Sequence, residues 1–347
     1  MIIINKIKKI LRWYITDIKA RLGIGNTEIL LRGNLPAYAP QEPKLLSVPL
    51  EDESFSISDV LHGTFCTPEH ADSIPFSLWV ETQHASECIR YYPAGLSSSE
   101  NPKVMVFIPG DLLLRTNKGE RLVPPGYKSN SPKKVLNMMQ QWADDANTPA
   151  IYIGRPGTFG SSGNHEERRQ TTEIELMNQS LNLLKEKHHI NEFILVGQSG
   201  GGQIAAAMLN LRKDITAAVI TAGLLPVHLL TRRWRKNRRS PGVKKYPLDT
   251  LYDPTTAIAA IPKDPQPTLV IISDPRDQAV PFYSQVIYVN KLKKEGLTVH
   301  HIYAHAPLPK RHALGEHGKK AAALIAKGAN IKDIRIAMVS EDMKNIS

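Results

Sequence analysis

The chain has 347 residues, of which 41% are hydrophobic and 22% charged, close to the proportions of an ordinary folded globular protein. This composition excludes a wholly disordered chain, a collagen-like fibre and a protein with many membrane-spanning helices. Lysine and arginine outnumber aspartate and glutamate by 44 to 33, and the net charge of +11 is compatible with a nucleic acid, an anionic membrane surface or an acidic substrate as partner.

The first predicted element is a basic amphipathic helix over residues 1–24. Its apolar side chains recur at steps of three and four residues, and lysine and arginine fill the opposite side. The charges interrupt the apolar run that a membrane span or a signal peptide requires, so we expect neither. Two interpretations stay open, a helix packed on its own domain and a helix lying on an anionic membrane surface. We expect a cytoplasmic protein that is peripherally associated with membranes in the second case.

A proline-rich polar stretch follows, so we divide the chain into a helix and linker over residues 1–50 and one domain over residues 51–347. Short apolar runs typical of strands begin near Phe55, and segments with helical periodicity alternate with the later runs. Strands that are apolar along their whole length are buried on both faces, as in a parallel sheet covered by helices. The pattern predicts an α/β fold with a mostly parallel central sheet, flanked by helices and beginning with antiparallel strands.

The potential metal ligands do not form a convincing site. Cys66 and Cys88 lack metal-site spacing and are too few for a disulfide framework, so they leave the redox compartment open. His300, His301 and His305 are close in sequence, but the first two point to opposite faces of a strand. We therefore expect no metal and no cofactor.

The most concentrated charge lies in residues 231–245, with eight lysines and arginines and no acidic residue. Such a run is usually a solvated loop. No zinc finger, helix-turn-helix or RNA-binding signature accompanies it, so we do not expect a nucleic-acid partner.

The motif that carries chemistry is GQSGG at residues 197–201, which joins the apolar strand FILV to a helix rich in small residues. In a G-x-S-x-G elbow the sharp turn holds the serine, here Ser199, in a sparsely populated backbone conformation with its hydroxyl exposed. The helix begins at the serine, so its free N–H groups and positive dipole end face any oxyanion formed there. A phosphate-binding loop is less favoured because the Walker lysine is missing and the glycine spacing fits a dinucleotide turn poorly.

With this motif in place, the stretch from about residue 55 to residue 327 resembles the α/β-hydrolase superfamily. The resemblance implies a catalytic triad whose members follow in the order serine, acid, histidine. The family's D-x-x-V-P motif matches Asp277, with Asp274 as the alternative acid. The histidine of the last loop matches His312, and His305 and His317 are the alternatives.

The resemblance also implies an oxyanion hole made by two main-chain amides. One belongs to the residue after the nucleophile, Gly200, and the other to the loop after the third strand. Where many members carry His-Gly, this chain has Pro109 and Gly110, so the second donor is the amide of Asp111 or of Leu112. A carboxylate at Asp111 would oppose a developing oxyanion unless it points away.

Two further segments match the family plan. GRPGTFGSSG at residues 154–163 is similar to a loop near the nucleophile, and we expect Arg155, together with Gln198, to contact the substrate. Residues 224–266 lie where the family inserts a cap, and a small cap is expected there. Arg232, Arg233 and Arg235 in this segment would then attract an anionic substrate or a lipid head group.

These observations predict a serine hydrolase that cleaves an ester, thioester or amide through an acyl-enzyme intermediate, with a small-molecule or lipid-like ester favoured. A peptidase of the same fold is the first alternative. A catalytically inactive hydrolase-fold binding protein is the second, because fold does not imply function.

Overall fold

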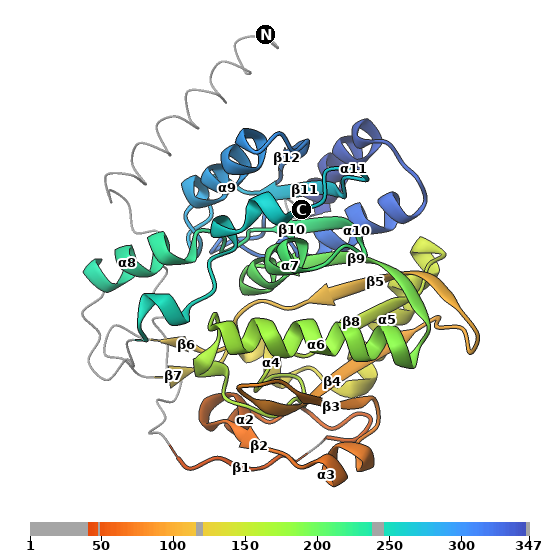
Figure 1. Cartoon of the computed structure of the whole chain (residues 1–347), viewed down its shortest axis with the longest axis vertical. Coiled ribbons are helices and arrows are strands. Elements are labelled where there is room, and N and C mark those ends of the chain that lie inside the picture. Colours follow the sequence, from red (N-terminus) through yellow and green to blue (C-terminus); the bar gives the residue numbers. More distant parts are fainter. Residues whose placement is uncertain (1–40, 48, 116–120, 238–245, 345–347) are drawn as a thin grey trace.

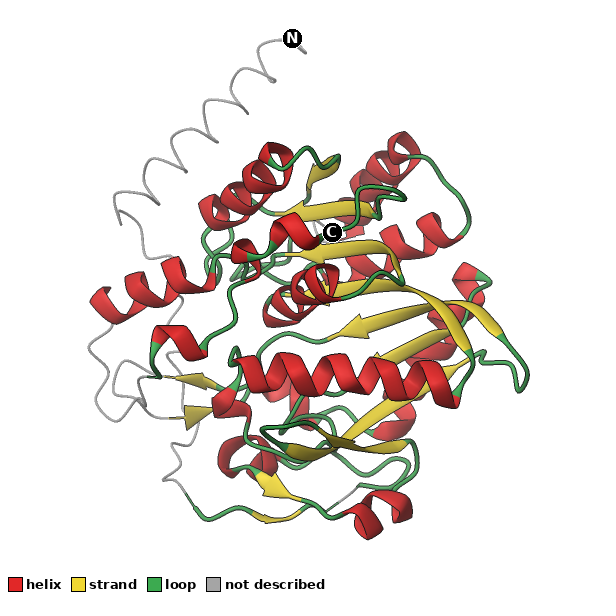
Figure 2. Cartoon of the chain, in the orientation of Figure 1, coloured by secondary structure: helices red, strands yellow, loops and turns green. Residues whose placement is uncertain are grey.

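The structure is a computed structural model, and it describes residues 41–47, 49–115, 121–237 and 246–344 (Figures 1 and 2). Its centre is an eight-stranded sheet. In spatial order the strands are β12 (Val299–Tyr303), β11 (Thr268–Ser273), β10 (Ile215–Thr221), β9 (Ile190–Gln198), β5 (Asn101–Ile108), β8 (Ala150–Ile153), β4 (Ser86–Ala94) and β3 (Ser77–Glu81). Strand β4 runs antiparallel to both of its neighbours and every other pair is parallel, which confirms the predicted sheet.

Helices cover both faces of this sheet, as its apolar strands require. One face packs against α6 (Thr171–Lys187), α7 (Gly200–Leu211) and α9 (Phe282–Lys294). The other packs against α5 (Pro132–Ala146), α10 (Gly315–Ala326) and α11 (Ile331–Lys344). Figure 1 shows α6 and α7 in front of the sheet. Helix α7 is buried along almost its whole length, because its small side chains let it lie close to the strands.

The ends of α5 illustrate how the sequence sets an element. Ser131 accepts the N–H of Lys134 and so caps the first turn, and a proline occupies the first helical position. Asn147 ends the helix in the left-handed conformation, with φ of 48°. Between these caps Met139 and Trp142 lie three residues apart and are buried on the same side, so the helix presents one apolar face to the sheet.

The described N-terminal part adds β1 (Lys44–Leu45), α2 (Ile57–His62), β2 (Thr64–Phe65) and α3 (Pro68–Ser73) beside β3. A disulfide between Cys66 and Cys88 joins this part to β4, with the two Cα atoms 5.9 Å apart. The sequence alone did not predict the bridge, because two cysteines separated by 22 residues carry no spacing signal.

Short elements complete the described chain. They are β6 (Leu114–Arg115), β7 (Arg121–Leu122), α4 (Pro125–Lys128), α8 (Val227–Asn237) and the 3₁₀ turns His165–Glu167, Leu248–Thr250, Pro254–Thr256 and Ile258–Ala260. The segment between β10 and β11 therefore consists of α8 and three turns in its described part, and α8 projects beyond the sheet (Figure 1).

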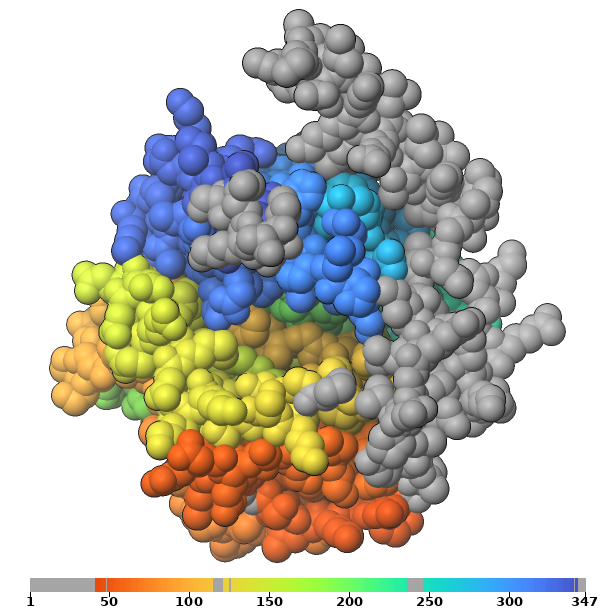
Figure 3. Space-filling view, turned by 180° about the vertical axis from the view of Figure 1, so that it is seen from behind, coloured from red at the N-terminus to blue at the C-terminus, as the bar shows by residue number. Residues whose placement is uncertain are grey.

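Seen from behind, the described chain is laid out along the long axis of the molecule (Figure 3). The N-terminal residues form one end, the C-terminal residues form the other, and the segment coloured yellow lies between them. The helix predicted over residues 1–24 lies outside the described residues, as do positions 238–245 of the basic run. Within the described chain, no helix has both the length and the apolar character needed to cross a membrane.

Candidate active site

Ser199 stands at the turn between β9 and α7, in the strained conformation that the motif predicts. Its φ of 55° and ψ of −115° lie in a region that costs a non-glycine residue about 1–3 kcal/mol. Glycines surround it because the chain segments approach too closely for side chains. A Cβ atom at Gly197 would overlap the main chain of Gly201, and one at Gly201 would overlap the Ile108 carbonyl.

Main-chain hydrogen bonds hold the elbow in this conformation. The Ser199 N–H donates to the Thr221 carbonyl at 2.9 Å, while the Ser199 carbonyl accepts the N–H groups of Gly202 and Leu224, each at 3.0 Å. The elbow is thereby tied to β10 and to the segment that follows it, so the surrounding structure sustains the local strain.

Asp277, which matches the family's D-x-x-V-P motif, and His312, which was predicted from chain order, lie in direct contact. The Asp277 Oδ2 and His312 Nδ1 atoms are 2.7 Å apart. The other oxygen, Oδ1, accepts the N–H groups of Ala279 and Val280 at 2.8 and 3.0 Å. Burial raises the pKa of the Asp277 carboxyl, and the imidazole and the two amides oppose this rise. A carboxylate on Nδ1 selects the tautomer that leaves Nε2 free to accept a proton.

The alternative acid and histidines are engaged in other pairs. Asp274 accepts from the Arg276 Nε at 3.0 Å and from the N–H of Ala306. Arg276 in turn donates to His305 Nδ1 at 2.5 Å. His317 pairs with Asp342 at 3.0 Å, between α10 and α11.

Gln198 was expected to contact the substrate, but the structure assigns its side chain a different partner set. The Oε1 atom accepts from the Thr221 hydroxyl at 2.7 Å and from the Leu314 N–H at 3.1 Å, and the Nε2 atom donates to the His312 carbonyl at 2.9 Å. Because these bonds occupy both polar atoms, Gln198 connects the elbow to the loop that carries His312.

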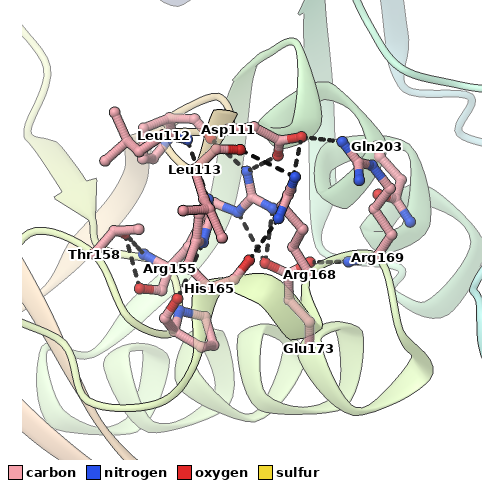
Figure 4. Close-up of polar contacts among 12 residues, drawn as sticks. Asp111, Leu112, Leu113, Arg155, Thr158, His165, Arg168, Arg169, Glu173 and Gln203 are labelled. Carbon is pink, nitrogen blue, oxygen red and sulfur yellow. Dashed lines mark hydrogen bonds and ion pairs between the residues drawn. The ribbon is translucent and has the colours of Figure 1, made fainter. Parts of the chain in front are cut away.

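Arg155 was also expected to contact the substrate, and the structure contradicts this because its side chain is 0% exposed. Its Nε donates to Glu173 at 2.9 Å and its Nη1 to Asp111 Oδ1 at 2.8 Å (Figure 4). A guanidinium taken out of water needs such carboxylate partners. Arg155 is therefore part of the scaffold beneath the site.

Asp111 has two more arginine partners, Arg168, whose Nε lies 3.2 Å from Oδ2, and Arg169. Burial alone would raise the pKa of the Asp111 carboxyl, but the charges of Arg169, Arg155 and Arg168 hold it well below its usual range. Arg168 and Arg169 were not predicted from the sequence. Their only sequence signal is an ordinary charged run, EERR, after the glycine-rich loop.

One of the two candidate amides for the second oxyanion donor is already occupied. The Leu112 N–H donates to His165 Nε2 at 3.2 Å, and His165 Nδ1 donates to the Pro156 carbonyl at 3.2 Å. Burial, with the charges of Arg155 and Arg168, lowers the pKa of His165 well below its usual value, so the imidazole is neutral. The Asp111 N–H has no hydrogen-bond partner within the described residues.

This amide belongs to main chain that lies against the nucleophile. A Cβ atom at Gly110 would come within 3.1 Å of the Ser199 Cβ. On the other side, the Gly200 N–H is the first amide of α7 and has no intrahelical acceptor. Two N–H groups are thus available beside Ser199.

Helix α8 contacts the same scaffold. The Arg169 guanidinium lies 5.6 Å from the centre of the Trp234 ring, within range of a cation–π interaction. Arg233 lies over the Tyr283 ring at 5.2 Å, and Arg235 donates to the Tyr246 carbonyl. Arg232 is exposed.

No group of three His, Cys, Asp or Glu side chains suited to a metal ion occurs among the described residues. His301 is instead bonded through Nε2 to the Ser273 hydroxyl at 2.9 Å, and burial lowers its pKa to about 4.

No protein-family model and no curated protein sequence matches the chain. Solved structures do match. The esterase Est1E from Butyrivibrio proteoclasticus aligns with a TM-score of 0.50 and 10% identity over 73% of this chain and 98% of the esterase. A puromycin-hydrolyzing peptidase from Mycobacterium tuberculosis aligns with a TM-score of 0.51 and 14% identity over 73% of this chain and 39% of the peptidase.

An acylaminoacyl peptidase from Pyrococcus horikoshii also matches, with a TM-score of 0.44 and 12% identity over 66% of this chain. The chain spans 36% of the length of that peptidase. At these identities the likeness is one of fold. The chain has the α/β-hydrolase fold, as the resemblance predicted.

Proposed function

We propose that the protein is a serine hydrolase that cleaves an ester, thioester or amide bond through an acyl-enzyme intermediate. Ser199 is the nucleophile, His312 the general base and Asp277 the residue that orients the imidazole. The observation that carries this proposal is the 2.7 Å contact between Asp277 and His312, formed by loops at the same sheet edge as the strained Ser199.

The reaction follows from these positions. The Ser199 hydroxyl attacks the carbonyl carbon of the substrate, and its proton passes to His312 Nε2. The amides of Gly200 and Asp111 stabilise the oxyanion. When the tetrahedral intermediate collapses, the imidazolium protonates the leaving group and the acyl group stays on Ser199. Water, deprotonated by the same imidazole, then releases the acid and regenerates the serine.

Within this reaction class we favour an ester. Of the two structural neighbours described above with a TM-score of at least 0.50, the chain spans 98% of the esterase but 39% of the peptidase. Esterase and peptidase activity can be distinguished by measuring the hydrolysis of p-nitrophenyl acyl esters and of the matching p-nitroanilides. Faster turnover of the anilides would favour a peptidase.

The substrate that we propose is a small-molecule or lipid-like ester with a negative charge. Arg232 is exposed on α8, within the segment over residues 224–266 that we propose as a small cap, and is therefore available to attract an anion. The variant Arg232→Gln should lower kcat/KM for a carboxylate-bearing ester and leave a neutral ester unchanged. An equal effect on both esters would contradict this role.

For residues 1–24 we propose peripheral contact with an anionic membrane surface, on the strength of their basic amphipathic pattern. Vesicles containing phosphatidylserine should retain the full chain at low salt and lose it when these residues are removed. Equal retention of both chains would refute the proposal.

The central test is labelling by a fluorophosphonate, which reacts with activated serines. The wild-type protein should be labelled, whereas Ser199→Ala and His312→Ala should not. The control is His317→Ala, which removes a histidine that pairs with Asp342 instead. If the folded wild-type protein is not labelled, a catalytically inactive hydrolase-fold binding protein becomes the better interpretation.

A further inference from the structure

Five charged groups meet beneath the loop that follows β5. Arg155, Arg168 and Arg169 contact the Asp111 carboxylate, and Arg155 also pairs with Glu173 (Figure 4). Three guanidinium groups against two carboxylates leave one surplus positive charge within this cluster. Such a mostly buried arrangement is costly unless its geometry is well satisfied, so a specific role is expected of it.

The cluster acts on main chain that is adjacent to the nucleophile. The Asp111 carboxylate fills the space beside Gly200 where a side chain would start, so that a Cβ atom there would overlap Oδ1. Gly110, one residue earlier, lies against Ser199. The side chain of Asp111 thus packs against Gly200, whose N–H is one candidate oxyanion donor, while the main-chain N–H of Asp111 is the other candidate.

Two further bonds fix the same loop. Arg168 Nη2 donates to the Leu113 carbonyl at 3.0 Å while its Nε reaches Asp111. The Leu112 N–H donates to the neutral His165. Three successive residues are therefore anchored, and within the described residues the Asp111 N–H is left without a partner.

We propose that Asp111 is a positioning residue of the oxyanion hole, whose carboxylate, held by three arginines, fixes its own main-chain N–H toward the oxyanion. This inference rests on the proposed hydrolase function and deepens it. This chain has Pro109 where many family members carry a histidine, and the Asp111 carboxylate, two residues later, would hold the loop instead. The surrounding arginines outweigh the negative charge of this carboxylate.

The variant Asp111→Asn separates position from charge because the two effects have opposite signs. Asparagine has nearly the same shape but lacks the charge that holds three guanidinium groups. If the Asp111 charge only repelled the oxyanion, its removal would raise kcat. If Asp111 positions the donor, kcat falls, and we expect a loss of about 10- to 100-fold, below the roughly 10²–10³-fold measured when a donor is deleted outright.

The readouts are chosen so that a merely structural role would not produce them. A donor that acts only in the transition state changes kcat and leaves KM nearly unchanged. The affinity for a boronic acid, which forms a tetrahedral adduct on the serine, should fall in parallel with kcat/KM. Turnover is expressed per serine that is labelled at the end point, so unfolded protein does not contribute.

The matched control is Asp214→Asn. Asp214 is also bound by two cationic side chains, Arg212 and Lys185, at 2.7 Å each, but it precedes β10 at the opposite edge of the sheet. The variant Asp214→Asn should lower the melting temperature without changing kcat per active serine. Arg168 also donates from Nη1 to the His165 carbonyl at 3.0 Å. If Asp111→Asn does not fold, Arg168→Lys tests the same contacts, because one ammonium cannot reach the Asp111 carboxylate and the Leu113 and His165 carbonyls together. We expect about a tenfold loss of kcat.

The outcomes distinguish this inference from the proposed function. An unlabelled wild-type protein would refute the hydrolase itself. An active wild type with kcat unchanged or raised in Asp111→Asn, and unchanged in Arg168→Lys, would overturn the positioning role and leave the hydrolase intact. A parallel loss of kcat and boronic-acid affinity in the variants that fold, with Asp214→Asn unaffected, supports it.

Discussion

Gln198, the residue before the nucleophile, should control the position of His312. Its side chain bonds the His312 carbonyl at 2.9 Å, the Leu314 N–H at 3.1 Å and the Thr221 hydroxyl at 2.7 Å. The variant Gln198→Met keeps the length of the side chain and removes all of these bonds. Gln198→Glu still accepts from Leu314 and Thr221 but cannot donate to His312, so it isolates one bond.

The magnitude follows from what each variant leaves unpaired. A buried main-chain group without a partner costs about 1–3 kcal/mol, and Gln198→Met leaves both the Leu314 N–H and the His312 carbonyl without their hydrogen-bond partner. Because the loop can relax toward water, we expect about 2–3 kcal/mol of lost unfolding free energy for Gln198→Met and about half of that for Gln198→Glu. A shift of the imidazole by about 1 Å should lower kcat by roughly 10²-fold.

Two measurements check this prediction on the same samples. Denaturant unfolding gives the loss of stability, and steady-state hydrolysis of a p-nitrophenyl ester gives kcat and KM. The effect should fall on kcat, because a displaced base affects the transition state more than substrate binding. A folded Gln198→Met protein with kcat within twofold of the wild type would refute the view that this side chain positions the histidine loop.

Three further predictions concern individual residues or pairs. Asp277→Asn should lower kcat by about 10⁴-fold with little effect on KM in ester hydrolysis, since the imidazole would lose the tautomer that the carboxylate selects. Burial raises the pKa of Glu87 to about 7, so the folded state holds this proton between about pH 4.5 and 7, and the free energy of unfolding falls as the pH rises through that window. Urea unfolding should therefore show Glu87→Gln to be more stable than the wild type by about 1–2 kcal/mol at pH 8 and equally stable at pH 4. A gain in stability that is independent of pH would contradict the raised pKa. Replacing both Cys66 and Cys88 by alanine should cost about 3 kcal/mol in the same unfolding assay, because the bridge closes a loop between residues 22 apart, while kcat stays unchanged.

Much of the fold was predictable because it depends on local patterns. Strands such as β8 are apolar at every position, and only a sheet covered on both faces buries such strands. The triad candidates were predictable for a different reason. The resemblance implies the chain order serine, acid, histidine, so Asp277 was chosen by the D-x-x-V-P motif and His312 by its place in the last loop, and the structure brings these two together.

The contacts that the sequence did not predict are those that join distant segments through side chains. Gln198 looked like a substrate contact because its neighbour is the nucleophile, but its partners Thr221 and Leu314 lie 23 and 116 residues further along the chain. The disulfide has the same character. Neither a periodicity nor a motif reports such pairs, since they depend on the final packing of the sheet edge.

At Asp111, partners that are distant in sequence change the inference about how a carboxylate affects the oxyanion. Considered locally, a carboxylate beside the oxyanion opposes catalysis. Its arginine partners Arg155, Arg168 and Arg169 are 44, 57 and 58 residues away in sequence and within hydrogen-bonding distance in space. The potential at the oxyanion depends on all of these charges and on their distances, and with Glu173 included the cluster carries a net charge of +1. The carboxylate is thus the anion that lets three cations be buried beside Ser199, so part of the +11 net charge of the chain lies directly beneath the site where the oxyanion would form.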